Sequence, residues 1–172
     1  HAVLRKSLAF AMKRIACVFK RQSCDDCALK QSCTYAYLFE TPPPKDQPVS
    51  KNHTAVPQPF VMYPEDDQKR GFRAGETLSV IIVLFGRAGK YLPYFLYAFE
   101  ELGRRGIGRG RGRFSVRQVA VADSNAELYD GSGSVSPVMP HMNIWKALSA
   151  YAAAVIIRQL TLRFITPTRI KH

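Results

Sequence analysis

The chain has 172 residues, 47% of them hydrophobic, with ten phenylalanines, which is enough apolar material for one domain or for one domain and part of a second. Its net charge of +12 and pI near 9.8 predict an acidic partner, of which nucleic acid is the commonest. The apolar run Val80 to Phe85 is too short to cross a membrane, and no signal peptide is visible, so we expect a cytoplasmic protein with no membrane partner.

The first predicted element is an amphipathic helix near the N-terminus. Its apolar stripe, at helical spacing, consists of Leu4, Leu8, Ala11, Ile15 and Val18. The opposite face is basic and carries Lys6, Lys13, Arg14, Lys20 and Arg21. Such a face is either simply solvated or in contact with RNA, and the spacing favours neither.

All four cysteines lie within one block of seventeen residues that follows this helix: Cys17, Cys24, Cys27 and Cys33. The two-residue gap between Cys24 and Cys27 is typical of the knuckles that chelate zinc, so the block predicts one structural zinc ion. An iron–sulfur cluster and plain buried or free thiols remain the alternatives. Four cysteine ligands leave no open coordination position, so the sequence predicts no catalytic metal.

Three strands are expected in the first half of the chain. The first is Tyr35 to Phe39, and the prolines from Pro42 onward end it. Residues 45–58 are polar and read as a surface loop. Phe60 to Tyr63 is a short strand. Thr77 to Phe85 is apolar on both faces, which is typical of a central strand covered on both sides.

A second amphipathic helix follows, with Pro93 in its first turn. Its apolar stripe consists of Leu92, Phe95, Leu96, Phe99 and Leu102. Gly103 is a suitable C-cap, and the positive charges of Arg104 and Arg105 suit the negative, C-terminal end of the helix dipole.

The run from Gly103 to Arg113 contains five glycines and five arginines in eleven residues. Glycine lets the backbone approach a ligand, and arginine presents a permanent planar charge suited to phosphate. The run therefore predicts a loop that holds an RNA backbone, and the alternative is a disordered Arg/Gly tract that binds RNA loosely. The predicted RNA-binding residues are Gly103, Arg104, Arg105, Gly106, Gly108, Arg109, Gly110, Arg111, Gly112 and Arg113. These glycines do not satisfy G-x-G-x-x-G and no Walker lysine motif is present, which disfavours a nucleotide-binding enzyme.

Beyond this run, Phe114 to Val121 reads as a strand with a bulge near Gln118. Residues 123–140 read as a linker, residues 145–154 as a short helix and residues 160–164 as a final strand. The order of elements predicts an α+β fold, namely a ferredoxin-like (RRM-like) antiparallel sheet with helices on one face and a Cys-rich metal-binding insertion.

Segments that match a known family are spread over nearly the whole chain. They are Val3 to Arg5, the cysteine block with Thr34 to Pro44, Tyr91 to Phe95, Phe99 to Phe114, and Leu160 to Arg169. On these residues the chain resembles the CRISPR-associated repeat-processing endoribonucleases of the RAMP superfamily. The resemblance implies a ferredoxin-like domain at 1–123 that lacks its first strand and has the Cys-rich insertion at 17–33. It also implies a linker with a short helix at 124–158 and the first strand of a truncated second domain at 159–172.

The resemblance implies a function as well. The family cuts the repeats of a CRISPR transcript without metal and leaves a 2′,3′-cyclic phosphate, so the implied partners are this RNA and a CRISPR effector complex. No motif fixes the catalytic residues, for which His1, His53 and His141 are candidates beside the remaining imidazole, His172. A fragment of this kind is expected to bind RNA and to cleave it little. The alternatives are a non-catalytic RAMP-type subunit and another zinc-stabilised RNA-binding module.

Overall fold

The computed structural model describes residues 2–20, 22–43, 56–66, 68–69, 71–122, 124–133 and 135–136, together with Ser149. The chain divides into two compact units, His1–Met139 and Pro140–His172. The helix predicted at 145–154 (Ser149 apart) and the strand predicted at 160–164 lie outside the described residues. No helix in the described part of the chain has the length and apolar character needed to span a bilayer.

The first unit contains helices and short antiparallel strand pairs, so the expected mixture of helix and strand is confirmed. In chain order its elements are α1 (Ala2–Ala16), a π-helical turn η1 (Ala36–Glu40), β1 (Phe60–Pro64), β2 (Val80–Leu84), a 3₁₀ helix η2 (Gly86–Tyr91), α2 (Leu92–Arg105), β3 (Val119–Ala120) and β4 (Glu127–Tyr129).

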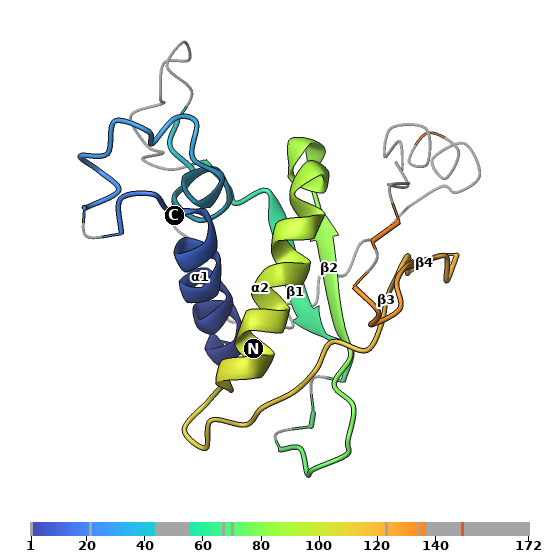
Figure 1. The fold of residues 1–172 in the computed structure, drawn as a ribbon. Helices are drawn as coiled ribbons and strands as arrows, with labels where there is room; N and C mark the ends of the chain where they lie inside the picture. The colour runs from blue at the N-terminus through green and yellow to red at the C-terminus, as the bar shows by residue number, and fades with distance from the viewer. Residues whose placement is uncertain are drawn as a thin grey trace, which may run out of the picture. The chain divides into compact units, whose positions relative to one another are not determined.

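The core lies between the two long helices and one face of the β1–β2 hairpin (Figure 1). The hairpin is antiparallel, with Phe60 opposite Leu84 and Pro64 opposite Val80. Phe60 and Met62 share a strand face and are buried, whereas Val61 between them is exposed. The helices contribute the buried side chains Leu4, Leu8, Ala11 and Met12 from α1 and Phe95, Leu96, Ala98 and Leu102 from α2. Both predicted stripes are thus confirmed in their main positions, although Val18 lies beyond the end of α1 and is exposed.

The strand predicted at Tyr35 to Phe39 is wrong, because this segment is helical. The Tyr37 N–H donates to the Cys33 carbonyl at 2.9 Å, and the Thr41 N–H donates to the Ala36 carbonyl at 2.7 Å. The rings of Tyr35 and Phe39, four residues apart, stack at 5.4 Å, a contact that helical spacing allows. The Phe39 ring then meets the Phe60 ring edge-on at 5.2 Å, so packing against β1 overrides the β propensity of the aromatic residues.

Two other predictions about the sheet need correction. Among the described residues β2 pairs with β1 alone, and Val83 is 39% exposed, so the strand is not covered on both faces. The strand predicted at 114–121 is reduced to β3, which pairs antiparallel with β4 and has a register irregularity between Val119 and Ala120. β4 falls in the segment predicted as a linker, so the boundary expected at residue 123 lies inside the first unit.

Candidate nucleic-acid interface and cysteine pocket

The glycine-rich run begins inside α2 and not after it. The C-cap predicted at Gly103 is wrong, because the helix continues to Arg105 and ends at Gly106, whose φ is 81°. The Gly106 N–H donates to the Leu102 carbonyl at 2.7 Å. Gly103 is needed for another reason. A Cβ on this residue would lie 2.1 Å from the Phe114 carbonyl oxygen, so glycine allows the returning chain to cross the helix directly.

Residues 106–113, called here the Arg/Gly turn, form a defined hairpin turn and not a disordered tract. The backbones of Ile107 and Gly112 exchange two hydrogen bonds, at 2.9 and 3.0 Å. The Arg111 N–H donates to the Gly108 carbonyl at 3.2 Å and closes the loop. Gly108 and Arg111 have left-handed φ angles of 72° and 46°. These bonds hold the backbone from which the arginine side chains extend.

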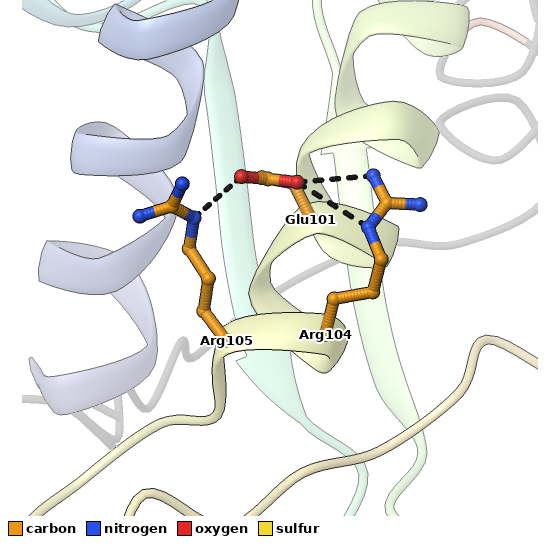
Figure 2. Close-up of polar contacts among 3 residues, drawn as sticks. All are labelled: Glu101, Arg104 and Arg105. Atoms are coloured by element: carbon orange, nitrogen blue, oxygen red, sulfur yellow. Dashed lines mark hydrogen bonds and ion pairs between the residues drawn. The ribbon is translucent and has the colours of Figure 1, made fainter.

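Two of the five arginines are paired with a carboxylate of α2 (Figure 2). The Arg104 guanidinium lies 3.0 Å from Glu101 Oε2, and the Arg105 Nε–H donates to Glu101 Oε1. The hydrogen bond from Arg105, and to a smaller extent that from Arg104, holds the pKa of the Glu101 carboxyl below its usual value. Part of the positive charge at the start of the run is therefore neutralised by the protein itself.

The other three arginines keep their charge available. Arg109, Arg111 and Arg113 are exposed, and none of their side chains pairs with another described residue. They occupy every second position, with the exposed Gly110 and Gly112 between them. An array of this kind can donate paired hydrogen bonds to successive anionic groups.

The basic face of α1 adds a feature that the sequence stripe does not reveal. Phe10 is 75% exposed, and the exposed Lys6 and Arg14 lie one helical turn before and after it. α1 begins at the end of the helix pair where α2 stops and the Arg/Gly turn follows (Figure 1). The sequence does contain a signal for this exposed ring: Phe10 is an apolar residue out of phase with the buried stripe, and a cation lies one helical turn away on each side. Lys13 instead lies over the Tyr35 ring at 5.3 Å, Lys20 is exposed beyond α1, and Arg21 lies outside the described residues.

The four cysteines line a single pocket. Its other lining residues are Phe19, Gln22, Lys30 and Ala36, and it has room for roughly one water-sized sphere. All four are free, half-buried thiols. Burial raises the pKa of the Cys24 thiol, and the Lys13 ammonium partly opposes this shift. As the side chains stand, no three His, Cys, Asp or Glu residues of the described ranges form a set that could hold a metal ion.

The histidine candidates for catalysis are not placed. His1, His53, His141 and His172 all lie outside the described residues.

Comparison with known proteins assigns the first unit to a family. Residues 2–140 match the AF_1859_N family model, which is described as an N-terminal domain. The chain belongs to the AF_1859_N family. The matched segment coincides closely with the first compact unit, His1–Met139.

One relative in this comparison is an uncharacterized protein of Archaeoglobus fulgidus. It is 27% identical to this chain over 130 residues, which are 74% of this chain and 42% of the relative. The chain therefore spans less than half the length of that relative. No solved structure matches the chain.

Proposed function

We propose that this chain binds RNA phosphates through the Arg/Gly turn and is the RNA-binding part of an endoribonuclease that processes CRISPR repeat transcripts. The observation that carries the proposal is the ordered turn with Arg109, Arg111 and Arg113 exposed and unpaired with other described residues. A guanidinium keeps its charge at any physiological pH and matches two phosphate oxygens with its planar fork. The glycines between the arginines leave room for an RNA backbone to approach the peptide backbone.

The exposed face of α1 supports single-stranded RNA as the ligand. Single strands are bound by cations that contact phosphates and by aromatic rings on which bases stack. Phe10 with Lys6 and Arg14 on either side supplies both groups. The net charge of +12 favours a polyanion over a neutral ligand.

The fold supports membership of the RAMP superfamily, although the finer topology is part of the proposal. The order α1, β1, β2, α2, with both helices against one face of an antiparallel hairpin, is that of the central αββα part of a ferredoxin-like unit. Fold alone does not define a function, so the proposal rests on the turn and uses the fold only as support.

The proposed reaction needs no metal ion. The 2′-hydroxyl next to the scissile bond attacks the phosphate, the bond to the 5′-oxygen breaks, and the products are a 2′,3′-cyclic phosphate and a 5′-hydroxyl. A general base accepts the 2′-hydroxyl proton, and a general acid donates a proton to the leaving oxygen. In this proposal the arginines of the turn hold the backbone in place, while His1, His53 and His141 remain the candidates for proton transfer.

The test combines binding and cleavage of a CRISPR repeat RNA by this chain in EDTA. We expect tighter binding of the repeat than of a scrambled RNA and little cleavage. Any cut should leave a cyclic phosphate and should stop when the 2′-hydroxyl at the cut site is replaced by hydrogen. Absence of RNA binding at low salt, or cleavage that EDTA abolishes, would refute the proposal. Equal affinity for both RNAs would favour the alternative of a general RNA-binding module.

A further inference from the structure

The loop that joins α1 to η1, residues 17–33, has no apolar interior of its own. Among its described residues only the four cysteines and Lys30 are half-buried, and all the others are exposed. Its backbone hydrogen bonds join residues only three apart: Gln22 to Phe19, Cys27 to Cys24, Lys30 to Cys27 and Ser32 to Leu29. A segment with so little buried apolar surface usually needs a cross-link to keep one structure.

The four thiols comprise two at the ends of helices and two on a turn between them. The Cys17 N–H donates to the Lys13 carbonyl at 2.9 Å and so continues α1, and the Cys33 carbonyl accepts the Tyr37 N–H at the start of η1. Cys24 and Cys27 lie on the tight turn between them, and Cys24 packs against the core. All four nevertheless line the same small pocket.

The charges around the pocket suit a tetrathiolate site. Four thiolates and one zinc ion have a net charge of −2, which Lys13 offsets together with Lys30, the latter only in part because it is also paired with Asp25. Lys30 lines the pocket and Lys13 lies beside Cys24. Asp25 is exposed and is engaged by the Lys30 ammonium at 2.7 Å, and neither Asp25 nor Asp26 lines the pocket. The donors that remain are sulfur atoms, which favour zinc over oxygen-seeking cations.

We propose that Cys17, Cys24, Cys27 and Cys33 bind one structural zinc ion that fastens the 17–33 loop to the ends of α1 and η1. The thiols do not form a ligand set as they stand, so binding requires side-chain rotation and a small closure of the loop around the pocket. The loop follows the C-terminal end of α1, whereas the Arg/Gly turn lies at the end where α1 begins (Figure 1). The ion would therefore stabilise the unit from the end of α1 opposite the Arg/Gly turn.

The first test uses the full chain purified anaerobically without chelator. We expect one zinc per chain by elemental analysis. All four thiols should react slowly with an alkylating reagent until zinc is removed, and trypsin should cut at Lys20 and Lys30 readily only after removal. Less than half a metal ion per chain after zinc is supplied, iron in place of zinc, or equal alkylation with and without zinc would overturn the proposal.

A pair of variants separates metal loss from general unfolding. Cys27→Ser should lose most of the zinc, whereas Gln31→Ala, an exposed change in the same loop, should retain it. Circular dichroism of Cys27→Ser should keep the signal of α1 and α2, since these helices pack through their own buried stripes. Full zinc content in Cys27→Ser would contradict the assignment of ligands.

Discussion

At the scale of single residues, four glycines of the run differ in why glycine is needed. Gly103 and Gly106 are required by space, because a Cβ would lie 2.1 Å from the Phe114 oxygen and 2.2 Å from the Arg111 oxygen. Gly108 is required by its φ of 72°, whereas Gly110 has neither constraint. The composition of the run predicts a turn, but it cannot distinguish these roles, because each constraint comes from a tertiary contact or a backbone angle.

Substitution of these glycines by alanine should therefore have unequal effects on stability. Gly103→Ala should reduce the free energy of unfolding by about 1–3 kcal/mol, because the overpacked Phe114 carbonyl must move, even though alanine is the better helix former. Gly110→Ala should change it by less than about 0.5 kcal/mol. Urea unfolding of the two variants measures the difference. Equal stabilities would show that the Gly103 crossing is not tight in solution.

Gly110→Val tests whether RNA approaches the backbone of the turn. The position is open and has no positive φ, so the variant should unfold like the parent chain. If a phosphate backbone lies against the turn, the valine side chain should weaken RNA binding by roughly tenfold, or ~1.4 kcal/mol. Fluorescence anisotropy with a labelled single strand gives the Kd. Unchanged affinity would restrict the contact to the arginine side chains.

Phe10 is the residue expected to stack on a base. Phe10→Ala removes an exposed ring and should leave the fold intact, while affinity for single-stranded RNA should fall by at least fivefold, equivalent to ~1 kcal/mol. Val3→Ala, an exposed apolar change on the same helix, is the matched control. Equal Kd values for the two variants would show that Phe10 lies outside the RNA-binding surface.

At the scale of elements, sequence patterns succeed where the signal is local. α1, α2 and β1 follow from stripes or alternation within their own residues, and Pro93 marks the first turn of α2. η1 is missed because its helical form depends on the Tyr35–Phe39 stack and on the Phe60 ring, which is distant in sequence. β4 is missed because Gly, Ser and Asp around it suggest a linker, whereas its Tyr129 is buried.

The attachment of β4 to α2 is open to a direct test. The Tyr129 hydroxyl donates to Glu100 Oε1 at 2.5 Å, and this bond raises the pKa of the tyrosine. Tyr129→Phe keeps the ring and removes the bond, so Tm should fall by about 2 °C. Calorimetry provides the measurement, with Tyr97→Phe on the exposed side of α2 as the control. A Tm equal to that of the parent chain would mean that the bond contributes nothing in solution.

At the scale of the whole molecule, the sequence suggests a partner class but not how the charges of the candidate site are arranged. The charge of +12 and the Gly103 to Arg113 run favour the proposed RNA partner. They do not reveal that Glu101 pairs with Arg104 and Arg105 and offsets one of their two charges, while three other arginines stay available. The cysteine spacing indicates a metal site. That Cys17 and Cys33 lie at helix ends is visible only in the structure. The AF_1859_N match covers the unit that contains both features.

The central claim is that the Arg/Gly turn binds RNA phosphates, and the salt dependence of affinity tests it most directly. The variant Arg109→Gln with Arg111→Gln and Arg113→Gln is compared with an equally charged control altered at exposed cations elsewhere, namely Arg73→Gln, Lys90→Gln and Arg117→Gln. Each lost phosphate contact lowers the slope of log K against log salt by about 0.7 on single strands. The account predicts a slope reduced by about 2 in the turn variant and nearly unchanged in the control. Equal slopes in the two variants would contradict it.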